Sequence, residues 1–214
     1  IVTGVQTCAL PILINLYWYW YSIEEKCIIV SRKWYFEEIK IIEGGSEMEF
    51  NKATEEDVNS IMNIIRQAQD YFKEQGINQW QDNYPNSEIV KNDIKNKNGY
   101  VLLKNNIIVG TVVVSFDGEK NYEHVYGGKW VSNGAYAVIH RIAIDSNNKG
   151  LGLSSIIIKN IEKICLNKEV HSIKIDTHKE NISMQNMLLK NGFKYCGLIY
   201  LENKNERVAF EKRL

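Results

Sequence analysis

The sequence contains little proline, no excess of either charge and no recognisable cysteine pattern. With two prolines in 214 residues and no internal repeat or low-complexity tract, its length indicates one domain, or one domain with an extension. Lysine plus arginine and aspartate plus glutamate number 26 each, so the net charge favours neither nucleic acid nor an acidic membrane as a partner. The four cysteines lack metal-ligand or disulfide spacing, which indicates a reduced, cytoplasmic location and no metal site.

The first 47 residues differ from the rest of the chain. Residues 2–12, VTGVQTCALPI, resemble the translation of a common sequencing adapter, and residues 13–34 show no sustained helical or strand period. A signal peptide's basic start and cleavage site are missing, and the charges at 24–26 cut the apolar run short of the ~20 residues of a membrane span. Purine-rich codons, as in a bacterial ribosome-binding site, can encode the string EGGSE at 43–47. We therefore expect translation to start at Met48 and residues 1–47 to be a non-native or disordered leader.

From Met48 onward the hydrophobic pattern alternates between strand and helix periods. One helix is expected between Thr54, a good N-cap, and Gly76, a stop, and others at 87–95, from Gly152 to about 167, and at 180–190. Strands are expected at 49–53, 100–103, 107–116, 135–144, 171–177, 194–201 and 207–210. The order β-α-α-β-β-β-α-β-α-β-β predicts an α/β (α+β) domain over residues 48–214. Its sheet should be mixed and mostly antiparallel, with helices on both faces.

A strand, a glycine turn and a helix start meet at residues 139–155, IHRIAIDSNNKGLGLSS. The first amides of a helix have no internal acceptor and lie at the positive end of its dipole, so they can bind an anion. Glycine at 150 and 152 removes the Cβ atoms that would keep a phosphate from those donors. The glycine pair alone fits equally well with a simple strand-to-helix connection.

The element order and two motifs resemble the GNAT superfamily of acetyl-CoA-dependent N-acyltransferases. Residues 147–152, NNKGLG, match the family's Arg/Gln-x-x-Gly-x-Gly/Ala signature at both glycines, although Asn147 replaces the usual Arg or Gln. The second signature is an Asn followed by a helix ending in Leu-Tyr-x-Lys-x-Gly-Phe, and residues 181–193 match it at Asn181 and in the final Lys, Gly and Phe. Leu188 stands where the family often has a tyrosine that protonates the departing CoA thiolate. An acid catalyst at that position is therefore absent.

The resemblance implies acetyl-CoA as co-substrate and no metal. It places the pyrophosphate at the glycine turn and the pantetheine arm along the strand that ends at Ile144, which should splay from the strand at 171–177. The Ile142 N–H would polarise the thioester carbonyl. The implied cofactor contacts are Ile142, Ala143, Ile144, Asn147, Asn148, Lys149, Gly150, Leu151, Gly152, Leu153, Asn181 and Leu188.

Amine transfer needs a base, and His140 is the foremost candidate. Its ordinary pKa suits neutral pH, and strand geometry would put it on one face with Ile142 and Ile144. The alternative is a histidine packed in the sheet. Glu123 and His124 are weaker candidates, and Asp176 and His178 are expected to be capping or surface groups. The residues considered for the chemistry are therefore the base candidates His140, Glu123 and His124, the oxyanion donor Ile142, and the capping or surface groups Asp176 and His178.

Aromatic residues gather in the two irregular connections, at Trp80, Tyr84, Tyr122 and Trp130. They fit an acceptor pocket, with Trp80, Tyr84 and Tyr122 as substrate contacts, or a satellite core under long loops. The cysteines at 165 and 196 are expected to be small core residues.

Two functions from different classes follow. The first is an acetyl-CoA-dependent N-acetyltransferase that moves the acetyl group to a primary amine by direct attack in a ternary complex. The acceptor would be a small molecule rather than a peptide, and the protein a cytoplasmic monomer or homodimer without nucleic-acid or membrane partners. The alternative is a non-catalytic acyl-CoA sensor or scaffold, since Leu188 cannot donate a proton.

Overall fold

The computed structural model describes residues 18–23, 26–33, 36–43 and 46–214. The adapter-like segment, residues 2–12, lies outside these residues. The strands are β1 (Trp18–Ile23), β2 (Lys26–Lys33), β3 (Phe36–Glu43), β4 (Ser46–Lys52), β5 (Gly99–Lys104), β6 (Ile107–Ser115), β7 (Ala137–Ile144), β8 (Ser172–Thr177), β9 (Lys194–Tyr200) and β10 (Glu206–Arg213). The helices are α1 (Val58–Glu74), α2 (Ser87–Lys95), α3 (Leu153–Asn167) and α4 (Ile182–Lys190).

One sheet runs through the described part of the chain in the order β1-β2-β3-β4-β5-β6-β7-β8-β10-β9. The pairs are antiparallel except for β7 with β8, which are parallel. From β4 onward the elements follow the predicted order, so the mixed, mostly antiparallel fold is confirmed. The single parallel pair falls at the strand that precedes the glycine turn.

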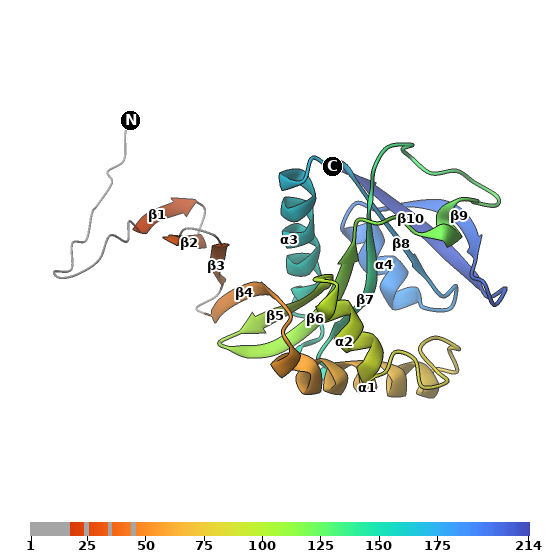
Figure 1. The fold of residues 1–214 in the computed structure, drawn as a ribbon, viewed down its shortest axis with the longest axis horizontal. Coiled ribbons are helices and arrows are strands. Elements are labelled where there is room, and N and C mark those ends of the chain that lie inside the picture. Colours follow the sequence, from red (N-terminus) through yellow and green to blue (C-terminus); the bar gives the residue numbers. More distant parts are fainter. Residues whose placement is uncertain (1–17, 24–25, 34–35, 44–45) are drawn as a thin grey trace.

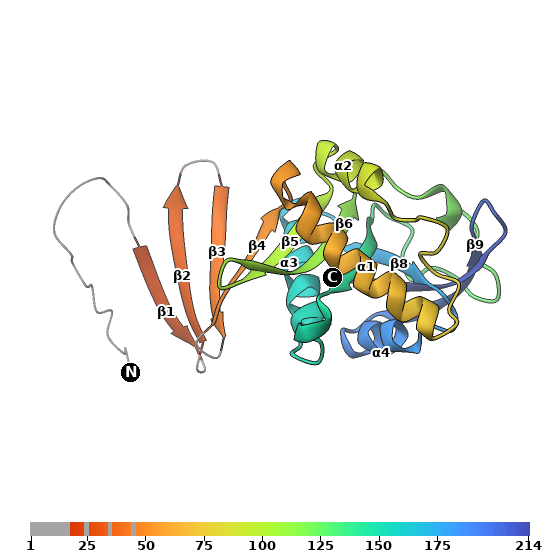
Figure 2. The ribbon, with the colours of Figure 1, turned by 90° about the horizontal axis from the view of Figure 1, so that it is seen from below.

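Helices cover both faces of this sheet (Figures 1 and 2). Alternate residues of β5 show the two sides: Tyr100 and Leu102 are buried in the cluster that contains α3, whereas Val101 is buried in the cluster formed with α1 and α2. The α4 residue Leu188 belongs to the α3 cluster. Burial of apolar side chains on both sides therefore fixes the register of the central strands.

The long connection after β6 forms a third cluster against the β8–β10 end of the sheet. Tyr122 is buried there with Cys196 and Ile199, and Trp130 packs against them. Glu211 on β10 is fully buried and accepts hydrogen bonds from the backbone N–H of Val131 and the hydroxyl of Ser172. These contacts hold the connection over one face of the sheet.

Strands β1–β3 extend the sheet beyond β4, away from the helices (Figure 2). The pairing of β3 with β4 joins Ile41 to Met48, Ile42 to Glu47 and Glu43 to Ser46. The sequence pattern did not anticipate these strands, because residues 13–34 carry no clear alternation. Whether residues 1–47 belong to the native protein stays a prediction.

We expect a chain that begins at Met48 to fold normally. The described core clusters consist of residues from Met48 onward, so its apolar burial should persist without the earlier strands. The Tm should change by no more than about 4 °C, the size of a ~1 kcal/mol effect at this length. Thermal melting of both chains measures this, and a much larger drop would show that β1–β3 support the fold.

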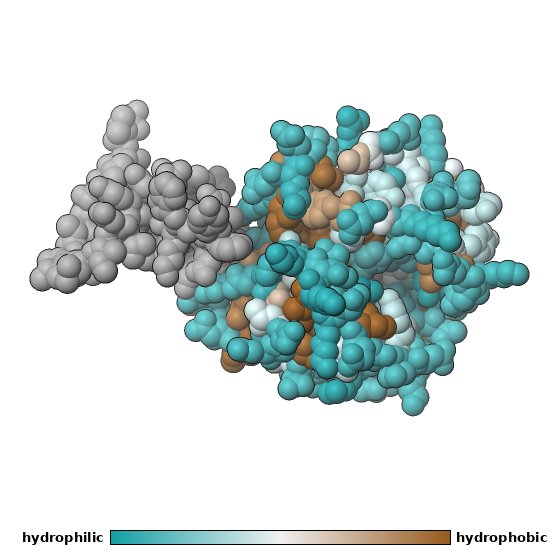
Figure 3. All heavy atoms as spheres, in the orientation of Figure 1, coloured by the Kyte–Doolittle hydropathy of each residue, from teal (hydrophilic) through white to brown (hydrophobic). Residues whose placement is uncertain are grey.

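The surface seen in Figure 3 is mostly hydrophilic, and hydrophobic residues show in gaps between the elements. Within the described residues, no helix is long and apolar enough to cross a membrane.

Candidate active site

The site lies where β7 and β8 separate. Their pairing joins Ala137 to Ile173 and Val138 to Lys174, and the described register continues no further. A cavity of about 840 Å³ opens beyond that point, lined by residues of β7, β8, the connection between α1 and α2, and the turn between β9 and β10. The predicted splay between these two strands is therefore present.

A bulge interrupts β7 at Arg141. The register pairs His140 with Val113 and Ala143 with Thr111, so Arg141 and Ile142 together oppose Val112. Arg141 takes a φ of 50°, an unusual backbone angle for a residue other than glycine in a strand. The bulge places Ile142 between two register pairs of the β6–β7 ladder, and the described register gives it no residue partner of its own on β6.

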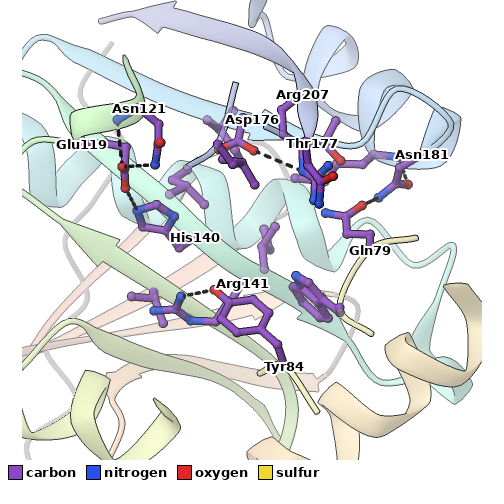
Figure 4. A pocket seen from close by; sticks show the side chains of 18 of the residues that line it. Gln79, Tyr84, Glu119, Asn121, His140, Arg141, Asp176, Thr177, Asn181 and Arg207 are labelled. Carbon is purple, nitrogen blue, oxygen red and sulfur yellow. Dashed lines mark hydrogen bonds and ion pairs between the residues drawn. The ribbon is translucent and has the colours of Figure 1, made fainter. Parts of the chain in front are cut away.

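The bulge also corrects the predicted orientation of His140. Ile139, Ile142 and Ile144 all contact the core cluster that contains α3. These residues share one face although Ile139 and Ile142 are three positions apart, where a regular strand would have two. His140 points to the other side, toward Glu119 (Figure 4). The expected shared face was wrong because strict alternation fails at a bulge.

Arg141 is held by two partners from the α1–α2 region. Its Nε and Nη2 donate to the two oxygens of Asp93, at 3.0 and 2.6 Å, and its Nη1 donates to the Tyr84 hydroxyl at 2.9 Å. Burial raises the pKa of Asp93, although the guanidinium opposes this rise. The bidentate pair stabilises the strained bulge and joins α2 to the site.

His140 lies beside a carboxylate on the long connection. Its Nε2 is 3.6 Å from Oε2 of Glu119, and both side chains are largely enclosed. Burial, aided by the nearby Arg141, lowers the pKa of His140 to about 4, against the opposing influence of Glu119. The imidazole is therefore neutral at pH 7 and keeps a lone pair that can accept a proton.

Asp176 lies inside the cavity, contrary to the expected capping or surface role. The Tyr122 hydroxyl donates to its Oδ1 at 2.7 Å, and the Nε of Arg207 lies 3.9 Å from Oδ2. Burial raises the pKa of this carboxyl, while the bond from Tyr122 and the charge of Arg207 lower it. The end of β8 points inward because β7 no longer covers it.

The glycine turn after β7 is fixed by its own polar contacts. Asp145 accepts hydrogen bonds from the Asn147 N–H and the Asn148 side chain, and Gln67 of α1 donates to its other oxygen at 2.9 Å. These bonds, chiefly that from Gln67, lower the pKa of Asp145. Gln67 also accepts from the Ser146 N–H, so α1 holds the turn at two points.

Backbone amides at the start of α3 remain available for a ligand. Across the described residues, the N–H groups of 150–154 have no acceptor, and Gly152, the N-cap, offers no side chain. Gly150 and Gly152 have φ values of 80° and 75°, and a Cβ at either would meet no atom within 4 Å. Open space before unpaired amides at a helix start fits a pyrophosphate. Lys149, in the same turn, lies over the Tyr71 ring at 4.4 Å.

The start of α4 joins the cavity to the α1–α2 connection. Asn181 caps α4 by accepting from the Met184 N–H, and its Nδ2 donates to Gln79 Oε1 at 3.1 Å (Figure 4). Leu188 does not line the cavity: it is 0% exposed inside the α3 cluster. Met184, one turn earlier on the helix, lines it instead.

The predicted aromatic contacts divide between the two alternatives. Trp80 and Tyr84 line the cavity, and the Trp80 ring packs edge-on against Phe72 with centroids 5.6 Å apart. Tyr122 is buried beneath the cavity and reaches it only through Asp176, so its assignment as a substrate contact is corrected. Trp130 belongs to the satellite core.

Several candidates lie elsewhere, and others were missed. Glu123 and His124 line a separate hollow with Trp130, so the structure does not support them as bases. Sequence reasoning missed Glu119, Asp93, Arg141 and Gln67, because polar residues on different elements give no local pattern. One signal was available, since a connection as long as the one that holds Glu119 is usually functional or disordered.

No group of three or more His, Cys, Asp or Glu side chains within the described ranges could hold a metal ion. Cys165 and Cys196 are free and buried, as predicted for core residues.

Comparison with known proteins agrees with this geometry. A GNAT-family acetyltransferase from Streptococcus agalactiae 2603 is 29% identical with a TM-score of 0.72, covering 78% of this chain and 95% of that chain. One from Listeria monocytogenes 4b F2365 is 20% identical with a TM-score of 0.62, over 82% and 99% of the two chains. The PaiA N-acetyltransferase of Thermoplasma acidophilum, solved in complex with coenzyme A, is 16% identical with a TM-score of 0.60, over 78% and 99%. The last two likenesses concern the fold alone.

No protein of curated function matches the chain significantly. The model of the acetyltransferase (GNAT) family matches residues 62–193, which include the cavity-lining strands, the glycine turn and the second motif. The predicted resemblance is thereby confirmed, and the chain belongs to the GNAT acetyltransferase family.

Proposed function

We propose that the protein transfers the acetyl group of acetyl-CoA to the amine of a small molecule. The observation that carries this proposal is the separation of β7 from β8 after Val138, with a cavity on one side and a glycine turn at the end of β7. A thioester arm that follows the free edge of β7 from the turn would bring its carbonyl beside the bulge. Family membership supports acyl transfer from acyl-CoA in general.

The residues present fit the co-substrate. The amides of 150–154 would hold the pyrophosphate, and the open edge of β7 would bond the pantetheine amides as an added strand does. When bound, acetyl-CoA supplies an activated acetyl group. The Ile142 amide, which lies at the bulge, would donate to the thioester oxygen as negative charge develops there.

The cavity provides for the proton balance of the transfer. The amine nitrogen forms a bond to the acetyl carbon, the carbon–sulfur bond breaks, and the sulfur takes a proton from solvent. The amine loses one proton, which neutral His140 would accept within the cavity. Glu119 beside it would stabilise the imidazolium that results.

One observation favours the alternative, a binding domain without turnover. Leu188 occupies the position of the family's frequent tyrosine and is fully buried in apolar surroundings, so it can neither donate a proton nor approach the sulfur without rearrangement. A thiol is a tolerable leaving group without an acid, and so we favour slow but real transfer.

The test measures CoA affinity by calorimetry and thiol release from acetyl-CoA with a panel of amines. We expect CoA binding together with amine-dependent thiol release, and mass spectrometry should find one added acetyl group on the amine. Binding without thiol release for polyamines, amino acids, aminoglycosides and peptides alike would favour the sensor. Absence of CoA binding would contradict both functions.

A further inference from the structure

The cavity carries more negative charge than the protein's own cations neutralise. Five carboxylates line it and face two guanidiniums, without any lysine: Asp82, Asp93, Glu119, Asp176 and Glu202 against Arg141 and Arg207. The whole chain is neutral, with 26 residues of each sign, so this local excess is a property of the cavity. Charges of one sign that line a cleft concentrate field lines there and attract an ion of the opposite sign.

Both guanidiniums are already committed. Arg141 forms its bidentate pair with Asp93, and Arg207 lies within ion-pair distance of Asp176 and donates to the Glu206 carbonyl. A ligand carboxylate would have to compete with these partners. The cavity is therefore poorly suited to an acceptor that carries its own carboxylate, such as an α-amino acid.

Two of the remaining carboxylates have no cation beside them. Glu119 has a side chain 23% exposed and faces the imidazole of His140, which is neutral at pH 7; its other contacts are to the amide groups of Asn121. Asp82, on the exposed α1–α2 connection, forms no ion pair within the described part of the chain. Glu202 differs, since Lys120 lies 3.5 Å away.

A second, independent feature indicates a polar ligand. Thr177, at the inner end of β8, is 1% exposed and lines the cavity, yet its hydroxyl has no hydrogen-bond partner among the described residues (Figure 4). A buried polar group without a partner is costly, so native structures rarely keep one. Eight asparagine and glutamine side chains also line the cavity and offer further oxygen acceptors. Ammonium groups satisfy acceptors of this kind.

We infer that the acceptor is a small molecule with at least two amino groups, at least one of them an ammonium attracted by Glu119 and Asp82. This inference rests on the proposed acetyl transfer. One amine, unprotonated, is the nucleophile, and the remaining charge provides binding energy and selectivity. Aliphatic polyamines and aminoglycosides share this chemistry.

The test compares diaminobutane with butylamine, which differ only in the second amino group. With saturating acetyl-CoA at low salt, kcat/KM should be at least about tenfold higher for diaminobutane. The attraction between an ammonium and a carboxylate in a partly buried site is large enough to change binding by more than that factor. The difference should shrink at ~0.5 M salt, because screening weakens it. Glycine, which carries its own carboxylate, should be a poor acceptor. Comparing kcat/KM for an aminoglycoside with kcat/KM for a longer polyamine shows which of these two kinds of amine the protein prefers. Equal kcat/KM for the two matched amines at low salt would overturn the inference.

Variants separate binding from chemistry. Glu119→Gln keeps an acceptor for the Asn121 amides but removes the charge. Because Glu119 also supports the His140 imidazolium, kcat should fall alike for both amines, whereas KM should rise about tenfold for diaminobutane alone. Asp82→Asn, on an exposed loop, should raise KM for diaminobutane about two- to threefold. Asp70→Asn, an exposed residue on α1 outside the cavity, is the matched control and should change neither. Unchanged KM in both cavity variants would contradict the inference.

Failure of transfer itself is distinguishable. If CoA binds but no amine releases thiol, calorimetry on the CoA-loaded protein compares the same two amines directly. Preferential binding of diaminobutane would uphold the inference and reject the transfer. Equal binding, or none, would reject the inference as well.

Discussion

Gly150→Val should abolish CoA binding while the protein stays folded. At Gly150 the Cβ of valine would enter the open space in front of the 150–154 amides, where the proposed pyrophosphate lies. The φ of 80° adds strain for a β-branched residue, on the order of 1–3 kcal/mol. We expect a loss of affinity of at least about 100-fold, which corresponds to ~2.7 kcal/mol. Calorimetric titration with CoA measures this, and thermal melting follows the fold.

A matched control separates the location from the strain. Gly127 has a φ of 66°, and a Cβ there would also meet nothing within 4 Å, but it lies in the long connection away from the turn. Gly127→Val should therefore lower the Tm by a similar amount and leave CoA affinity unchanged. If Gly150→Val retained the affinity of the unmodified chain, the phosphates would have to bind elsewhere.

The sequence predicted the fold from β4 onward because local chemistry and tertiary packing agree there. Helix α2 begins at the Asn86 cap and spans the predicted residues 87–95, and α1 ends just before Gly76, which takes a φ of 69°. Residues 99–102 of β5 are all buried, and alternate side chains join the clusters on the two faces of the sheet. The glycine turn also followed from the sequence, since two glycines with positive φ between a strand and a helix start are local features.

The interior of the cavity could not be predicted in the same way. Its bulge depends on Asp93, 48 residues before Arg141, and a bulge reverses which residues share a face. Glu119 meets His140 because β6, which precedes it, pairs with β7, and its backbone N–H is held by the Tyr136 hydroxyl. Leu188 was placed by motif alone, and packing against the α3 cluster buried it. Such contacts join residues that are far apart in the sequence, so they cannot be derived from local sequence spacing.

The low pKa of His140 has a defined effect on stability. Its value of about 4 in the folded protein lies below the ordinary 6.5, so the unfolded chain binds this proton more readily. As the pH falls from about 6.5 to about 4, this residue therefore costs the fold up to about 3 kcal/mol, and above pH 6.5 it costs nothing. His140→Ala should lose this part of the acid sensitivity, which urea unfolding at pH 5 and pH 7 measures.

The same substitution tests the base role, with the largest expected effect on turnover. Above about pH 5 the imidazole is unprotonated, so its own titration does not alter the rate between pH 7 and pH 9. The acceptor amine does titrate there: with an ordinary pKa near 10 it is mostly protonated at pH 7, and at pH 9 its free form is roughly 100-fold more abundant. A base that removes the proton matters most at the lower pH.

We therefore expect His140→Ala to reduce kcat by about 100-fold at pH 7, the lower end of the usual contribution of a general base. The reduction should be clearly smaller at pH 9, and CoA affinity should be unchanged at both. His171→Ala, which removes an exposed histidine outside the cavity, serves as the control and should match the unmodified chain. An equal loss at both pH values, or one accompanied by weaker CoA binding, would assign His140 a packing role at the bulge. The proton would then leave through water, held by the polar groups around Glu119 and Asp176.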